Sequence, residues 1–255
     1  MFLTLPKEPS LRFELAREFA ERFHCSPKGY PTINAKVIKQ YSKDIGLSLP
    51  LAVCEWYFLV GQIGDVWTGQ DHLQLPDASE FPVEILIPFW QDENKIQKII
   101  SGASIDSTFV PLMTENQGCF FMGYKVDDSG KPDPPVYCYT HELLYQLSET
   151  VSEFALQMLI IEAIYSAKYS WGDCGVSFDG RVINMIKEEF CLSAISNSRL
   201  WSFPIQFWVS DDVVWQINCD YSGEATSLGF VASTQKVFEQ TIEQLRALGV
   251  KGIQL

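Results

Sequence analysis

Basic residues are scarce in this chain, and their scarcity limits the partners that it can bind. The 255 residues include 19 lysines and arginines against 32 aspartates and glutamates, which gives a formal net charge of −13 at pH 7. Such an acidic excess repels nucleic acid phosphates and anionic membrane surfaces, whereas it attracts basic proteins at long range. We therefore expect no direct contact with nucleic acid and none with a membrane. The charge either steers a basic protein partner or serves solubility alone.

Long apolar runs are also absent, although 47% of the residues are hydrophobic. No segment approaches the ~20 uninterrupted apolar residues that a membrane span requires. The first nine residues lack a basic region followed by a longer apolar stretch, so they do not resemble a secretory signal. These features predict a soluble, cytoplasmic protein.

Close cysteine pairs are missing as well. The seven cysteines are an odd number, and most of them lie inside apolar runs, at positions 25, 54, 119, 138, 174, 191 and 219. We interpret them as reduced, buried thiols of a cytosolic protein, used as small hydrophobic residues, because neither a disulfide framework nor a zinc site has this spacing. We expect no metal and no cofactor.

Catalytic motifs are equally hard to find. The histidines at positions 24, 72 and 141 have different neighbours, and no Gly-x-Ser-x-Gly elbow accompanies them. Glycines 61, 64 and 69 match neither the dinucleotide nor the phosphate-loop pattern. Glu115 is able to act as a general acid or base if it is buried, but no second carboxylate stands at a defined spacing. A turn-organising or partner-binding role for Glu115 is therefore favoured. We expect a protein that is not an enzyme. The alternative, a hydrolase, has no group of catalytic residues in the sequence to support it.

A polar segment between two apolar runs predicts an antiparallel hairpin in the middle of the chain. Glu115-Asn116-Gln117-Gly118 separates residues 109–113 from residues 119–126. Gly118 is free to adopt positive φ, which suits a turn between the two strands. The next turn is Asp127-Asp128-Ser129-Gly130, and the prolines of Asp133-Pro134-Pro135 then keep the chain extended before a third strand at residues 136–139.

Helices are expected on both sides of this hairpin. Leu49-Pro50 opens a short helix that carries Trp56 and Tyr57 and should stop at Gly61. A long, almost entirely apolar helix is expected over residues 147–164, with capping-box spacing in Thr150-Val151-Ser152-Glu153. We expect this helix to be the one most deeply buried against the sheet.

Together these motifs resemble the SUKH superfamily over residues 41–167. This superfamily contains fungal cell-wall-assembly regulators and bacterial immunity proteins that neutralise secreted toxins. The resemblance implies an α+β fold, in which helices pack against a central, mainly antiparallel sheet. It also implies a non-enzymatic recognition protein, either an immunity-type protein that binds a basic, nuclease-type toxin or a regulatory scaffold.

The outer parts of the chain match only in the order of their expected elements. Leu11, Leu15, Phe19 and Phe23 predict a first amphipathic helix capped by Ser10, within a helical extension at residues 1–40 that precedes one α+β domain at residues 41–255. Further expected elements are a strand at 81–88, a helix at 92–100, a loop at 171–175, a helix at 182–190, a hairpin of 203–210 with 213–219, a strand at 226–232, and a final helix that starts at Ser233 or Thr234 and stops at Gly249.

Candidate partner-binding residues follow from the turns and from the tryptophans. Acidic residues at hairpin turns should face solvent, and alternation along a strand should bury one tryptophan of the second hairpin and expose the other as an interface anchor. The candidates are Asp127, Asp128, Asp211, Asp212, Trp208, Trp215 and Glu115.

Overall fold

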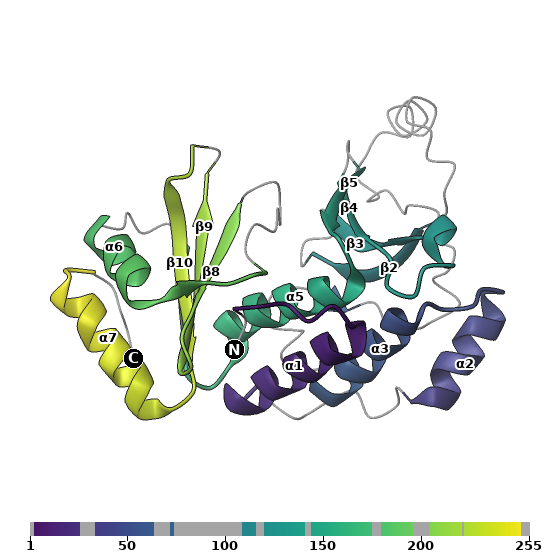
Figure 1. Ribbon diagram of the computed structural model, residues 1–255, viewed down its shortest axis with the longest axis horizontal. Coiled ribbons are helices and arrows are strands. Elements are labelled where there is room, and N and C mark those ends of the chain that lie inside the picture. Colours follow the sequence, from purple (N-terminus) through teal and green to yellow (C-terminus); the bar gives the residue numbers. More distant parts are fainter. Residues whose placement is uncertain are drawn as a thin grey trace.

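In the part of the chain that the structure describes, two five-stranded antiparallel sheets are joined by one long helix, α5 (Val151–Ser166), which runs between them (Figure 1). The expected α+β class is confirmed, with the strands divided between two sheets instead of one central sheet. The computed structural model describes residues 3–25, 34–63, 72–73, 109–115, 120–140, 144–174, 180–195, 204–220 and 222–250.

The first sheet has its strands in sequence order. They are β1 (His72–Leu73), β2 (Phe109–Thr114), β3 (Phe120–Lys125), β4 (Val136–Thr140) and β5 (Leu144–Ser148). The predicted hairpin is confirmed, because β2 and β3 pair antiparallel with Phe109 opposite Lys125. The strand after the prolines is confirmed as β4, whereas β5 was not predicted. The turn residues 116–119, the expected strand 81–88 and the expected helix 92–100 lie outside the described residues.

The second sheet has the order β6-β10-β9-β8-β7. Its strands are β6 (Ser170–Cys174), β7 (Cys191–Leu192), β8 (Ile205–Val209), β9 (Val213–Cys219) and β10 (Ala225–Ala232). The predicted hairpin is confirmed as β8 and β9, and the predicted strand at 226–232 is confirmed as β10. The predicted loop at 171–175 was wrong, because its residues form most of β6.

Two glycines explain why that segment is a strand. Gly172 of β6 lies opposite Gly229 of β10, and both face Ile164 of α5. A Cβ atom built at Gly229 would lie 2.5 Å from Cγ2 of Ile164, and one at Gly172 would lie 3.0 Å from the same atom. The glycines therefore allow α5 to approach the second sheet closely, instead of marking a loop.

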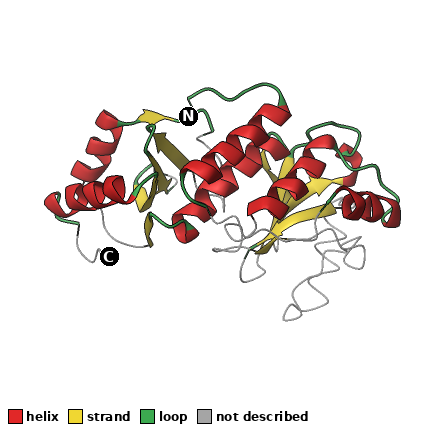
Figure 2. Ribbon diagram, turned by 90° about the horizontal axis from the view of Figure 1, so that it is seen from below, coloured by secondary structure: helices red, strands yellow, loops and turns green. Residues whose placement is uncertain are grey.

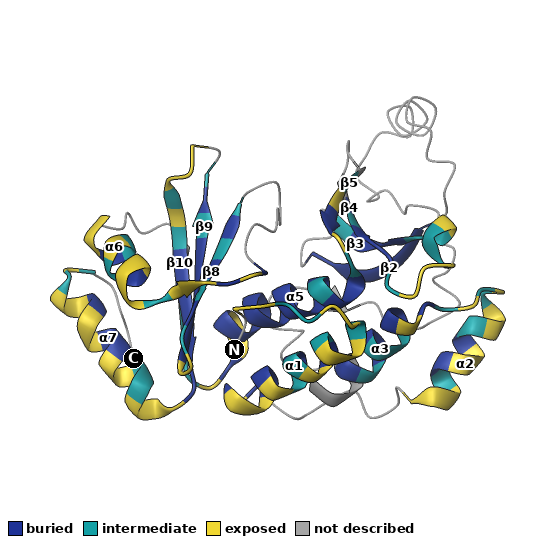
Figure 3. Cartoon of the chain, in the orientation of Figure 1, coloured by how far each residue is buried: buried dark blue, intermediate teal, exposed yellow. Residues whose placement is uncertain are grey.

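Helix α5 lies at the centre of the molecule. Its residues from Val151 to Ile164 are buried, apart from the partly exposed Glu153 (Figure 3). The N-cap half of the expected capping box is confirmed, since the hydroxyl of Thr150 accepts a hydrogen bond from the backbone N–H of Glu153 at 3.2 Å. The helix begins at Val151 and not at residue 147, because the preceding residues complete β5.

The other helices within the described residues are α1 (Pro9–Arg22), α2 (Ala35–Asp44), α3 (Leu51–Ile63), α6 (Gly180–Glu189) and α7 (Gln235–Ala247). Helices α1 and α3 pack on α5 and form a layer beneath the first sheet (Figure 2). Helix α3 starts after Pro50 as expected, but it continues through Gly61 to Ile63. Helix α7 has Thr234 as its N-cap and ends before Gly249, whose φ of +87° fits the predicted stop.

The first helix differs from its prediction in its start and in its buried face. Pro9 occupies the first turn, where proline needs no hydrogen bond, so Ser10 is not the cap. Phe13, Phe19 and Phe23 have no exposed surface, whereas Leu11 is 45% exposed. Helix α1 thus shares one core with α3, α5 and both sheets. None of the described helices has the length and apolar content needed to cross a bilayer.

Candidate functional site

The acidic turn Asp211-Asp212 joins β8 to β9 and is exposed, as expected. Ser210 shapes this turn, because its hydroxyl accepts hydrogen bonds from the backbone N–H groups of Asp212 at 3.2 Å and of Val213 at 3.0 Å. The carboxylate of Asp212 accepts a hydrogen bond from the hydroxyl of Ser233 at 2.7 Å and lies 3.6 Å from the guanidinium of Arg22. The turn therefore presents acidic groups at one end of the inner strands of the second sheet.

An open groove of about 690 Å³ lies beside this turn. Ser210 and Val213, which flank the two aspartates, form one edge together with the end of α6, and one face of α7 forms the other. The described residues that line it include two glutamates and no lysine, arginine or histidine. They are Glu189, Phe190, Ser210, Val213, Val237, Gln240, Thr241, Glu243, Gln244 and Ala247.

The second acidic turn has different surroundings. Val126–Asp128 form a short 3₁₀ helix after β3, and Asp127 is exposed. The side chain of Asp128 is only 13% exposed, and its Oδ1 lies 2.7 Å from Nζ of Lys131. The hydrogen bond to Asp128 raises the pKa of Lys131. The expectation that Asp128 faces solvent was therefore wrong, since it is largely covered and paired locally.

Trp208 and Trp215 lie directly opposite each other across β8 and β9, so they share one face of the sheet. The expected split between a buried and an exposed tryptophan therefore does not follow from alternation. Trp215 has no exposed surface and packs on Phe230 with ring centroids 4.8 Å apart, which removes it from the candidate contact residues. Trp208 is half-buried, and its Nε1 donates to Oε1 of Gln206 at 3.1 Å.

Glu115 stands at the end of β2 and is 7% exposed. Its backbone N–H donates to the carbonyl of Phe120 at 2.9 Å, which extends the β2–β3 pairing by one step. This position fits the turn-organising role expected for Glu115 better than a surface contact.

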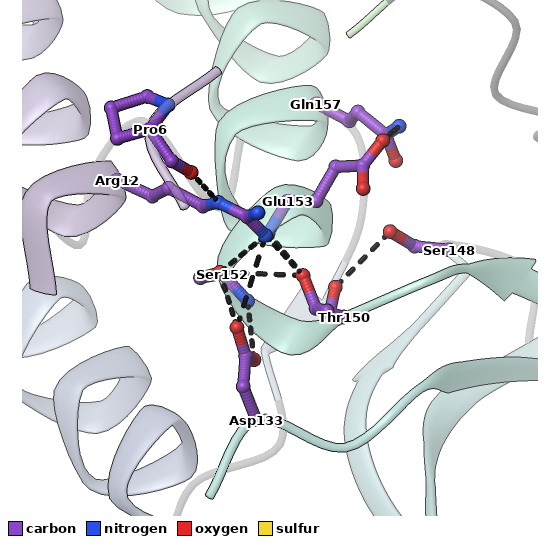
Figure 4. Close-up of polar contacts among 8 residues, drawn as sticks. All are labelled: Pro6, Arg12, Asp133, Ser148, Thr150, Ser152, Glu153 and Gln157. Atoms are coloured by element: carbon purple, nitrogen blue, oxygen red, sulfur yellow. Dashed lines mark hydrogen bonds and ion pairs between the residues drawn. The ribbon is translucent and has the colours of Figure 1, made fainter. Parts of the chain in front are cut away.

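A buried polar cluster at the start of α5 was not predicted as a unit (Figure 4). Asp133 accepts hydrogen bonds from the backbone N–H of Ser152 at 3.1 Å and from its hydroxyl at 2.5 Å. Arg12 donates to the hydroxyls of Thr150 at 2.9 Å and Ser152 at 3.2 Å, and its guanidinium lies 3.9 Å from Asp133. Its Nε donates to the carbonyl of Pro6 at 2.6 Å. A carboxylate at a helix N-terminus stabilises the helix, so the cluster anchors α5.

The proline-rich segment at residues 132–135 also accepts hydrogen bonds from the first turns of two helices. The carbonyl of Pro132 accepts a hydrogen bond from Ala52 in the first turn of α3 at 3.0 Å, and that of Pro134 accepts one from Val151 of α5 at 2.9 Å. Unpaired N–H groups at both helix starts thus find partners in one extended segment. The sequence shows the extended segment, but its role depends on residues far apart in the chain.

The surroundings of Glu153 in the first turn of α5 change the pKa of its carboxyl group. Burial raises its pKa, Arg12 opposes that effect, and the carboxylates of Glu149 and Asp133 add to it. Gln157 donates to Oε1 of Glu153 at 3.4 Å (Figure 4). The polar groups of this cluster form hydrogen bonds with one another within the chain, so the cluster stabilises the fold and anchors α5.

The described residues hold no metal-ligand cluster, and several of their cysteines are free thiols. Within these ranges no three histidine, cysteine, aspartate or glutamate side chains are placed to hold a metal ion. Cys25, Cys54, Cys138, Cys191 and Cys219 are free thiols, and Cys191 is exposed instead of buried. Burial raises the pKa of Cys25 to about 12, which keeps this thiol protonated and unreactive.

Comparisons of the chain with protein-family models, curated proteins and solved structures found no match.

Proposed function

We propose that this chain is a non-enzymatic recognition protein of the SUKH type that binds and neutralises a basic protein in the cytoplasm. The partner class that fits best is a nuclease-type toxin, since proteins that bind nucleic acid carry basic surfaces. One observation carries the proposal. The exposed turn Asp211-Asp212 borders a groove whose described lining contains two more acidic residues, Glu189 and Glu243, and no basic one.

The net charge of −13 supports the same function. Charges at an interface rim mainly accelerate association and select partners of opposite sign. The segments that resemble the SUKH superfamily support the proposal through the fold, because Asp133 and its neighbouring prolines position α3 and α5. Their role in the proposal is to build the scaffold, while the exposed acidic turns supply the contact.

Affinity capture at low salt, followed by binding measurements with the purified partner, tests this function. The proposal expects a basic protein to be retained, to bind with a 1:1 stoichiometry and to lose its activity in the complex. Retention of a signalling protein with no toxic activity would favour the regulatory scaffold. Failure to retain any basic protein from a source that contains the natural partner would contradict the proposal.

A further inference from the structure

The groove beside the acidic turn combines charge with an apolar floor. Val237 and Ala247 of α7 supply apolar side chains to the lining, together with Phe190 and Val213. Phe190 is half-buried and contacts the buried Trp215 edge to face, with ring centroids 6.0 Å apart. A second hydrophobic cluster, formed by α6, α7, β9 and β10, includes Val213 and Trp215, and Phe190 and Val237 pack against it. The floor is thus fixed by this cluster and is not a loose surface patch.

Two carboxylates belong to the described lining of the groove, beside its apolar side chains. Glu189 at the end of α6 and Glu243 of α7 line the groove, and both are exposed. The basic residues of the same two helices are not among the described lining residues; they are Arg181, Lys187, Lys236 and Arg246. A cation in the groove would therefore meet acidic groups from two elements and no basic side chain among the described residues of the lining.

The neighbouring turn already holds one cation of this kind. Arg22 of α1 extends to Asp212, with 3.6 Å between the guanidinium and the carboxylate. Both side chains stay partly exposed, at 38% and 57%, so the pair is a weak surface contact. This intramolecular pair shows that the turn beside the groove accepts an arginine.

From these features we infer that the groove binds a segment of a protein partner in which a lysine or arginine side chain stands next to an apolar one. The inference rests on the proposed function and specifies the binding site. The apolar side chain would cover Val237 and Phe190, while the cation would contact Glu189 and Glu243. A volume of about 690 Å³ accommodates such side chains, since ligand sites usually measure ~300–1,000 Å³.

Two short synthetic peptides with blocked termini test this inference. One alternates lysine with valine, and the other has the same charge with serine in place of valine. Nuclear magnetic resonance titration should move the amide signals of Phe190, Thr241 and Gln244, and the valine peptide should bind more tightly. Equal affinity of both peptides, or shifts confined to other surfaces, would overturn the inference.

A double variant provides the matched control. Glu189→Gln with Glu243→Gln should weaken binding of the valine peptide by about three- to tenfold, the effect expected when two exposed ion pairs are lost. Glu188→Gln with Glu239→Gln removes the same charge from the same two helices at exposed positions outside the groove lining. This control should bind like the wild type. An equal loss in both variants would show a general charge effect and contradict a site in the groove.

The natural partner separates failure of this inference from failure of the proposed function. If the groove variant binds a captured basic protein as tightly as the wild type, the groove inference fails while the recognition function stands. If no basic protein binds the wild type, both fail.

Discussion

At the residue scale, Asp133 shows how one carboxylate connects distant parts of the chain. It caps α5 through Ser152 and lies beside Arg12 of α1, with only 7% of its side chain exposed. Removing one partner of a covered charge pair leaves the other without compensation, which costs more than the loss of a surface contact. The carboxylate is thus a structural residue in the segment that carries the family resemblance.

The substitution Asp133→Ala should lower the free energy of unfolding by about 2–4 kcal/mol. The cost combines a lost helix cap with an uncompensated Arg12. Urea denaturation of wild type and variant measures the difference, and Asp127→Ala, an exposed site, serves as the control with a change within about 0.5 kcal/mol. Equal stability of the Asp133 variant and the control would show that the cap contributes nothing.

Glu153 gives a prediction for pH dependence. Burial raises the pKa of Glu153 in the folded state, so the folded protein holds this proton more tightly than the unfolded chain. Its contribution therefore favours folding below the unfolded value of about 4.3 and is lost as the pH rises through the folded pKa. Relative to Glu153→Gln, the wild type should become progressively less stable from pH 4 to pH 7. Paired urea titrations check this, and a difference that stays constant or grows with pH would contradict it.

Several local signals predict the structure correctly, whereas contacts between distant residues do not follow from the sequence. The Thr150 N-cap and the Gly249 stop each lie within one helix turn, so a short motif predicts them. Arg12 and Asp133 stand in different segments, and nothing in the spacing of either residue shows that they meet. For the same reason the sequence did not show that Trp208 and Trp215 share a face, which depends on strand register.

At the element scale, the contact between α5 and the second sheet depends on glycine. Gly229→Ala places a Cβ 2.5 Å from Cγ2 of Ile164, 3.2 Å from the carbonyl of Trp171 and 3.3 Å from Cα of Gly172. A β-branched side chain in a helix has little freedom to move away. The substitution should destabilise the protein by about 1–3 kcal/mol through overpacking.

A second substitution shows whether the clash is the cause. Ile164→Ala removes the Cγ2 atom, so the double variant should be less destabilised than the sum of the two single variants. Thermal or urea unfolding of the four proteins gives this coupling as a double-mutant cycle. Strict additivity would mean that the helix and the sheet do not meet at these residues.

The sequence predicted most of the described elements, and its errors have physical causes. The β6 segment contains Gly172 and Asp173, which are typical of loops, but the glycine serves close packing against α5. Gly61 is a helix breaker by propensity, yet α3 continues past it, because tertiary packing overrides the modest cost of one glycine in a helix. The groove was not predicted at all, since it is formed by α6, α7 and the β8–β9 turn together.

At the scale of the whole molecule, α1 connects both halves. Its arginines form ion pairs with three distant parts of the chain: Arg12 with Asp133 of the proline-rich segment, Arg17 with Glu55 of α3 at 2.9 Å, and Arg22 with Asp212 of the β8–β9 turn. Its phenylalanines are buried in the core that contains residues of both sheets. Helix α1 is therefore an integral part of the fold.

Deletion of residues 1–25 should abolish cooperative folding of both sheets. Burial of Phe13, Phe19 and Phe23 alone contributes about 5–9 kcal/mol, which is comparable to the typical total stability of a folded protein. Circular dichroism and urea denaturation of the truncated chain measure the effect. A truncated protein with a cooperative transition near that of the full chain would contradict the integral role of α1.

The central claim is that the acidic end of the second sheet recognises a basic protein. The measurement that tests it most directly is the association rate of the purified partner at low and at physiological salt, for the wild type and for Asp211→Asn with Glu189→Gln and Glu243→Gln. We predict that the wild-type rate falls steeply with salt, and that the triple variant associates more slowly at low salt and depends less on salt. Identical rates and identical salt dependence for the two proteins would contradict the account and leave solubility as the role of the acidic charge.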